Sequence, residues 1–362
     1  MLNRTNYISN IMKTDTYKEN RKYLILGHIV HEYVSTGVPV SSKVVAQKMG
    51  GRISSATVRN VMAELEEKGL IVQPHTSAGR VPTDHGYRCY VDIVKDQIRF
   101  EKQRARRLAE EYSKRIRTMK DVIAKTSFLI CRELHNAGVV MWPSLEDFYL
   151  KHMELVKLKA ERVMAILVTM TNDVRNHIIS LDRELKETEL ERVANFINSN
   201  YERSTFSGIT GDLRRMLQGS SGESGQVTEI ARTALAVIDS IIEEDIENEI
   251  YWEGLNYFME SDATRDLDLT KRILRIFSAK NNLARLLRRD LSRDGIMVHI
   301  GEEEGRDYLK GCSLITCGYT LRGRVIGRIG VIGPTRMDYD GAMSTVRCLS
   351  ELLSEKLKEI NS

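Results

Sequence analysis

Arg59 and Asn60 are the side chains best suited to chemistry with a nucleic acid, and both lie in a segment with helical spacing. An arginine guanidinium can donate two hydrogen bonds to guanine, and an asparagine amide can pair bidentately with adenine. Hydroxyl groups occur just upstream, at Ser54, Ser55 and Thr57. Hydroxyls and free backbone amides at the start of a helix suit phosphate oxygens. This set of residues predicts recognition of duplex DNA.

A second polar group lies in the segment PHTSAGR, which carries His75, Ser77 and Arg80. Gly79 permits a tight hairpin tip, so we expect these side chains on a β-hairpin along the sugar–phosphate backbone. Lys43, in a preceding helical segment, is a further candidate for phosphate contact. The candidate DNA-binding residues are therefore Lys43, Ser54, Ser55, Thr57, Arg59, Asn60, His75, Ser77 and Arg80.

Each of these residues also has an interpretation without a function. Arg59 could be a solvated helix arginine, Asn60 could bond a backbone group, and His75 is more typical of a surface residue than of a metal ligand. The serines could serve only as helix caps. The ordered set is more specific than its members, because capping, turn chemistry and apolar spacing agree over one stretch.

Three helices and a hairpin would position these side chains. Apolar residues at helical spacing predict a first helix over residues 22–33. Serines at 41–42 and 54–55 are placed to cap a second and a third helix. A strand over residues 70–72 and a return strand near Val81 follow. This order is typical of a winged helix-turn-helix.

Length and charge fit a DNA-binding module attached to other domains. The chain has 362 residues, enough for two or three domains, and 42% of them are hydrophobic. The net charge is only +4, so the chain is not a polycation. Residues 1–95 hold 13 basic and 8 acidic residues, and residues 96–120 hold 9 and 4. A basic amino-terminal part with an acidic remainder favours a separate nucleic-acid module.

The cysteines indicate a reducing compartment. They are odd in number, scattered, and contain no C-x-x-C pair, so we expect reduced thiols rather than disulfides or a zinc site. The amino terminus has no continuous apolar signal segment, and no apolar run approaches membrane-spanning length. We therefore expect a cytoplasmic protein with no membrane association.

Other groups capable of chemistry do not assemble a catalytic site. His28 and His31 could share a helix face, but no cysteine or carboxylate completes a metal site there. The acidic run 302–304 lies between glycines and favours an exposed loop. Glycines within 327–333 would permit close backbone approach rather than form a phosphate loop. We expect a protein that is not an enzyme, with no catalytic residue, no metal and no cofactor.

Beyond the amino-terminal module, apolar spacing predicts one long connector helix over residues 100–134. Two groups of strands follow, separated by a mostly helical stretch, and one sheet domain with an insertion at 187–268 accounts for that order. The predicted strands lie at 138–142, 153–159, 163–169, 174–181, 295–300, 312–319 and 323–332.

The insertion contains a candidate surface for a partner. A Gly/Ser-rich loop at 218–226 precedes a helix with apolar residues at helical spacing. These residues could face a second copy of the chain, or they could form an internal core. They are Leu235, Ile238, Ile241 and Ile242.

Two blocks of the chain resemble the HrcA family of bacterial heat-shock repressors. The first comprises SSATVRNVMAELEEKGLI and PHTSAGRVPTDHGYRCYVD within residues 54–92, and the second is GRVIGRIGVIGPTRMDY at 323–339, preceded by HIGEEE at 299–304. Together they span about a third of the chain. One departure is Ser41, where the family pattern has glycine; a serine there still suits a helix cap.

The resemblance implies an α+β, multidomain chain. We expect a winged helix-turn-helix domain at 1–98, a GAF-like domain at 99–186 and 269–362, and a mostly helical inserted dimerisation domain at 187–268. It also implies a homodimer that binds an inverted-repeat operator of the CIRCE type in double-stranded DNA, represses heat-shock chaperone operons, and depends on the GroEL chaperonin. The alternative is a transcriptional regulator whose GAF-like domain senses a small molecule.

Overall fold

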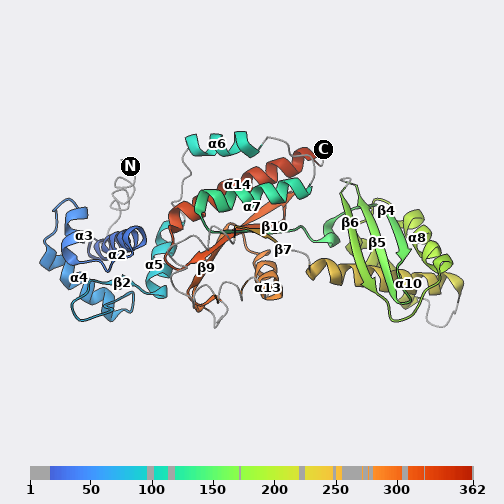
Figure 1. Cartoon of the computed structure of the whole chain (residues 1–362), viewed down its shortest axis with the longest axis horizontal. Coiled ribbons are helices and arrows are strands. Elements are labelled where there is room, and N and C mark those ends of the chain that lie inside the picture. Colours follow the sequence, from blue (N-terminus) through green and yellow to red (C-terminus); the bar gives the residue numbers. More distant parts are fainter. Residues whose placement is uncertain are drawn as a thin grey trace.

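The computed structural model describes residues 17–95, 102–112, 119–170, 173–219, 225–247, 250–254, 271, 276, 280–303, 309–321 and 323–360. Figure 1 shows three units in a row: an amino-terminal unit of helices, a central sheet flanked by helices, and a second unit of sheet and helices at the far end. This mixture of helices and antiparallel sheets agrees with the predicted α+β class.

The amino-terminal unit contains its elements in the predicted order. They are α2 (Tyr17–Thr36), α3 (Ser42–Lys48), α4 (Ser55–Glu67), β1 (Ile71–Val72), β2 (Val81–Pro82) and α5 (Asp84–Val94). Ser41 caps α3 and Ser54 caps α4, because each side chain accepts a hydrogen bond from a backbone amide three residues later. The turn between α3 and α4 contains Gly50 and Gly51, both with positive φ.

The central sheet has the strand order β7-β3-β10-β9-β8, and all neighbours are antiparallel. Its strands are β3 (Ala137–Met141), β7 (Ile250–Glu253), β8 (Ile296–Ile300), β9 (Cys312–Leu321) and β10 (Arg324–Pro334). α7 (Met119–Leu134) and α14 (Tyr339–Ile360) cover one face, and α13 (Lys280–Asp290) covers the other (Figure 1). These positions match the strands predicted at 138–142, 295–300, 312–319 and 323–332.

The single connector helix predicted over residues 100–134 is wrong. The chain instead forms α6 (Lys102–Tyr112) and α7. The Tyr112 hydroxyl lies 2.5 Å from the Thr126 hydroxyl, whereas one straight helix would separate these residues by about 21 Å along its axis. Arg107 likewise pairs with Glu133, with 3.0 Å between Nη2 and Oε2. The apolar stripe of α6 therefore packs back onto α7 and α14.

A second sheet contradicts the expectation of one interrupted sheet. Its order is β4-β5-β6, formed by β4 (Leu150–Lys157), β5 (Arg162–Thr169) and β6 (Val174–Ser180). α8 (Glu187–Tyr201), α9 (Phe206–Gly219) and α10 (Gln226–Glu247) pack on this sheet in one apolar core, which excludes the central strands. A boundary at residue 187 would divide this folded unit.

The inserted unit interrupts a single β-hairpin. β3 and β7 are antiparallel neighbours, with Met141 opposite Ile250, so residues 142–249 leave the central sheet and return to it between adjacent strands. The apolar stripe proposed on α10 is internal: Ile238 and Ile241 are fully buried, and Leu235 and Ile242 pack against the same core. Its role as a partner-facing surface is therefore wrong, and the internal-core interpretation is confirmed. Residues 220–224 of the predicted loop lie outside the described residues.

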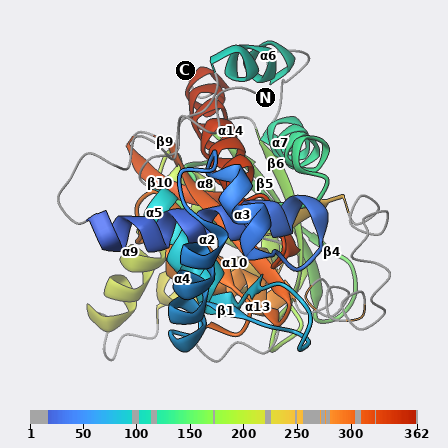
Figure 2. The same ribbon diagram turned by 90° about the vertical axis from the view of Figure 1, so that its left-hand side faces the viewer.

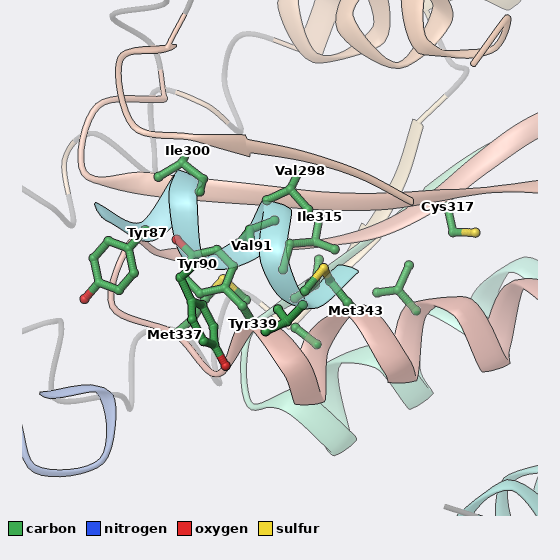
Figure 3. Close-up of a cluster of buried hydrophobic side chains, with 14 of the residues drawn as sticks. Tyr87, Tyr90, Val91, Val298, Ile300, Ile315, Cys317, Met337, Tyr339 and Met343 are labelled. Carbon is green, nitrogen blue, oxygen red and sulfur yellow. The ribbon is translucent and has the colours of Figure 1, made fainter. Parts of the chain in front are cut away.

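Helix α5 joins the amino-terminal unit to the central sheet. Figure 3 shows Tyr87, Tyr90 and Val91 of α5 against apolar side chains of β8 and the start of α14, including Val298 and Tyr339. The rings of Tyr87 and Tyr339 have their centroids 5.4 Å apart. One continuous core thus runs from α2 to α14, and it fixes the amino-terminal unit on the rest of the chain.

A rim of polar contacts surrounds this junction. Arg88 donates to both carboxylate oxygens of Glu303 and to the carbonyl oxygen of Val298 on β8. The Tyr90 hydroxyl donates to Asp340 at 2.7 Å and lies 2.8 Å from His31 Nε2. Burial is the largest single influence and lowers the pKa of Arg88, but the hydrogen bonds and charge of Glu303, together with the charge of Asp92, raise that pKa overall. The Arg88–Glu303 pair thus joins α5 to the end of β8.

Candidate nucleic-acid interface

Helix α4 has one buried and one exposed face. Val58, Val61, Met62 and Leu65 face the core, while Arg59 and Asn60 are exposed, as are the small residues Ala56 and Ala63. Within the described part of the chain, no hydrogen bond or ion pair engages the side chain of Arg59 or Asn60. Their donors and acceptors are thus available to a ligand, and the small neighbours allow close approach.

The hydroxyls at the start of α4 divide into two roles. Ser54 Oγ accepts from the Thr57 amide at 3.1 Å and lies 2.9 Å from the Thr57 hydroxyl, so both residues are part of the cap. Ser55 is exposed beside them. Lys43 is exposed on α3. Figure 2 looks onto the amino-terminal unit, which lies in front of the other units.

The hairpin between β1 and β2 is braced by a network that sequence reasoning missed. Arg80 Nε donates to Glu66 Oε2 at 2.9 Å, and the Gln73 amide donates to Glu66 Oε1 at 3.1 Å. The Gln73 side chain donates to the carbonyl oxygens of Thr76 and Ala78 across the loop. Arg80 is therefore an ion-paired, half-buried side chain, whereas His75 and Ser77 remain exposed at the tip.

Gly79 is required because two backbone segments approach closely here, and not because of the conformation of the turn. The backbone of Val40 forms a two-way bridge with Arg80, at 2.9 and 2.8 Å. A Cβ atom on Gly79 would lie 2.5 Å from the carbonyl carbon and oxygen of Val40, far inside contact distance. The backbone of Gly79 has no positive φ, so space is what requires glycine here.

Gly79→Ala is expected to push the hairpin away from the entry to α3 and lower the free energy of unfolding by about 1–3 kcal/mol, the range for overpacked sites. Denaturant unfolding followed by circular dichroism measures this loss. Gly211→Ala on α9 is the matched control, since nothing lies within 4 Å of its added Cβ, and a helical glycine gains about 0.5–1 kcal/mol on this change. Equal stability of the two variants would refute the close-approach argument.

The other groups considered for chemistry have structural partners. Burial, followed by the charge of His31, lowers the pKa of His28, which favours a neutral side chain beside the core. Glu303 is bound to Arg88. A Cβ atom on Gly330 would lie 2.4 Å from the carbonyl oxygen of Ile315, so the expected close backbone approach along β10 is confirmed there.

The described residues provide neither a metal cluster nor a membrane-spanning helix. No cluster of three or more His, Cys, Asp or Glu residues there has the arrangement of a metal site. None of the helices in that part of the chain is both long and apolar enough to cross a membrane.

The sequence of this chain is similar to those of transcription repressors. A family model described as the HrcA protein C-terminal domain matches residues 120–343. The heat-inducible transcription repressor HrcA of Xanthomonas oryzae is 35% identical over 334 residues, covering 92% of this chain and 94% of the relative. The corresponding repressor of Syntrophobacter fumaroxidans is 32% identical and covers 92% and 96%.

A solved structure agrees over nearly the whole chain. The crystal structure of a hypothetical protein has a TM-score of 0.61 and 25% identity, covering 94% of this chain and 98% of that one. The named relatives define the class, heat-inducible transcription repressors. Within that class, the chain belongs to the HrcA family.

Proposed function

We propose that the amino-terminal unit is a winged helix-turn-helix that binds double-stranded DNA. The observation that carries this proposal is the exposed pair Arg59 and Asn60 on a helix whose opposite face is buried. In this arrangement α4 enters the major groove, Ser55 and Lys43 meet phosphates, and the braced hairpin lies along the backbone. Donors aimed at base edges give sequence specificity, and the phosphate contacts give affinity.

The protein acts in this proposal as a repressor of heat-shock chaperone operons. Membership of the HrcA family supports that role, with an inverted-repeat operator of the CIRCE type and activity that depends on the GroEL chaperonin. Heat would divert chaperonin to other unfolded proteins and leave the repressor inactive. Two copies with twofold symmetry would read the two halves of the repeat.

The alternative is a sensor whose central, GAF-like domain binds a small molecule. The face of the central sheet under α13 argues against it. Side chains from β3, β9 and β10 meet Leu283 and Leu287 of α13 in an apolar cluster of buried residues. A ligand site of the usual kind needs a hollow with a few polar groups. The main proposal is therefore favoured.

The dimer is proposed to form through the exposed side of the inserted sheet. Along β5, Val163, Ala165 and Leu167 face the helices, and the alternate residues are only half-buried. Cross-strand pairing places Met164 between Val156 of β4 and Ile178 of β6, and Val168 beside Val174 of β6. Ile166 instead lies between the polar residues Glu154 and Asn176. We name this the outer sheet face; its apolar members are Val156, Met164, Ile166, Val168, Val174 and Ile178.

Half-buried and exposed apolar side chains gathered on one sheet face are typical of an interface. Face-to-face packing of two such sheets on a twofold axis would make the contact self-complementary. A second copy is the favoured occupant because the repressor must hold two DNA-reading units on one duplex.

The test is binding of the purified full-length protein to a labelled inverted-repeat duplex and to a scrambled duplex of equal length. We expect the inverted repeat to bind at least about 10³-fold more tightly, the lower end for specific proteins. Adding GroEL to heat-treated protein should restore the fraction that binds. Equal affinity for the two duplexes would refute the repressor proposal.

Arg80→Ala is expected to weaken binding to every duplex and lower the salt slope of the binding constant by about one unit. The geometry supports this: within the described residues the Arg80 side chain donates to Glu66 through Nε alone, so its terminal nitrogens are available to a phosphate. Titrations at several salt concentrations measure the slope. Lys68→Ala, at the far end of α4, is the control and should leave it unchanged; an unchanged slope in Arg80→Ala as well would make Arg80 only a brace of the hairpin.

A further inference from the structure

The root of the inserted unit is tied together by one arginine. Arg175 lies on β6, and its side chain is 10% exposed. Its guanidinium donates to Asp173 at 3.2 Å, to Asp245 at 3.0 Å and to the carbonyl oxygen of Pro143 at 3.5 Å. Pro143 belongs to the chain that has just left β3, and Asp245 to the end of α10 that returns to β7.

Further contacts hold the same group of residues together. The guanidinium carbon of Arg175 lies 5.4 Å from the ring centroid of Trp142 and 4.6 Å from that of Phe148. Asp245 also accepts from the Leu145 amide at 3.0 Å. The outgoing chain and the returning chain are thus both bound to β6 at one largely buried site, which we call the root clasp (Trp142, Pro143, Leu145, Arg175 and Asp245).

The root clasp lies where it can restrain tilting of the inserted unit relative to the central sheet. Two chain segments connect the inserted unit to the central sheet, and they start from neighbouring residues of β3 and β7. Two adjacent connections alone would allow the unit to tilt. Figure 1 shows the inserted unit beyond the end of the central sheet, where a small tilt at the root moves its far side most. Contact between α10 and α13 gives additional support.

We propose that Arg175 is a positioning residue that fixes the orientation of the inserted unit on the central sheet. In a dimer held by the outer sheet face, this orientation sets the distance between the two DNA-reading units and hence the preferred spacing of the operator half-sites. The second step rests on the proposed function. The claim that Arg175 fixes the orientation of the inserted unit concerns only a single chain. It can therefore fail or hold independently of the claim about operator spacing.

The chemistry of the clasp favours arginine over any other residue. A planar fork with five N–H donors can serve two carboxylates and a carbonyl while it stacks on aromatic rings. Lysine would keep the charge but lose the fork and the stacking. Methionine would fill similar space and leave Asp173 and Asp245 without their shared cation. The series arginine, lysine, methionine therefore weakens the clasp in two steps.

The test compares the wild-type protein with Arg175→Lys, Arg175→Met and the control Arg192→Met, which removes an exposed arginine from α8. Spin labels at the exposed positions Glu191 on α8 and Glu355 on α14 report the orientation by pulsed electron resonance. The labelled protein is diluted with unlabelled protein, so that distances within one chain dominate. We expect a narrow distribution in the wild type and control, a broader one in Arg175→Lys and the broadest in Arg175→Met.

Duplexes with half-site spacing varied in single base-pair steps provide the second readout. Arg175→Met should retain dimerisation and single half-site affinity, but its preference for the best spacing should fall on the order of tenfold as the tether becomes less rigid. Circular dichroism checks that each variant is folded. If Arg175→Met does not fold, Arg175→Lys is compared with the wild type instead. Unchanged label distances in the folded variants would overturn the clasp. Changed distances with an unchanged spacing preference would overturn its link to DNA, and a wild type that does not dimerise would instead refute the proposed function.

Discussion

Ile178→Glu is expected to convert the dimer into a monomer and lower operator affinity by about 10²–10⁴-fold, because tethering of two DNA-reading units is lost. Ile178 is 46% exposed on the outer sheet face, opposite Met164 in the strand register. On a twofold interface, one substitution introduces two carboxylates into an apolar contact. Burial of unpaired charge there is strongly unfavourable. Sedimentation and duplex titration measure the two effects.

Val227→Glu is the matched control for this change. Val227 is 54% exposed on α10, away from the outer sheet face, so the same charge added there should leave the dimer intact. Binding of Ile178→Glu to a single half-site should also match the wild type, which separates loss of assembly from loss of DNA recognition. A dimeric Ile178→Glu with full operator affinity would move the interface to another part of the chain.

The second large effect is expected on α4. Arg59→Ala or Asn60→Ala should each lose about 1–3 kcal/mol of specific binding per half-site, the range for a bidentate base contact. Affinity for random duplex should change much less, because no phosphate contact is removed. Both side chains are exposed, so stability should be unaffected. Equal losses on operator and random duplex in both variants would contradict base reading by α4.

The elements of the amino-terminal unit were predictable because their signals are local. A serine hydroxyl caps a helix that begins one residue later, and the buried side of α4 follows helical periodicity. The brace between Glu66 and Arg80 was not predictable, since it spans 14 residues and exists only after the hairpin has folded. Exposure of Arg59 was derived from spacing alone, but its contact with DNA remains a prediction.

The incorrect predictions arose where one sequence pattern is compatible with two different structures. Amphipathic spacing in α6 and α7 is the same for one long helix and for two helices that fold back. An apolar stripe on α10 is the same for an internal core and for an interface, and Ile238 belongs to the core. β5 is apolar on both sides, so alternation could not reveal that Val163 is covered while Val168 is not. Tertiary packing decided each case.

The interrupted hairpin also has a kinetic consequence for synthesis. Val140 of β3 pairs with Ile329 of β10, 189 residues later, and its other neighbour, Tyr251, follows the whole inserted unit. Sheets built from such distant segments close slowly. The nascent chain must therefore carry β3 and the apolar side of α7 unpaired until most of the protein has left the ribosome. That interval exposes the kind of surface on which folding assistants act.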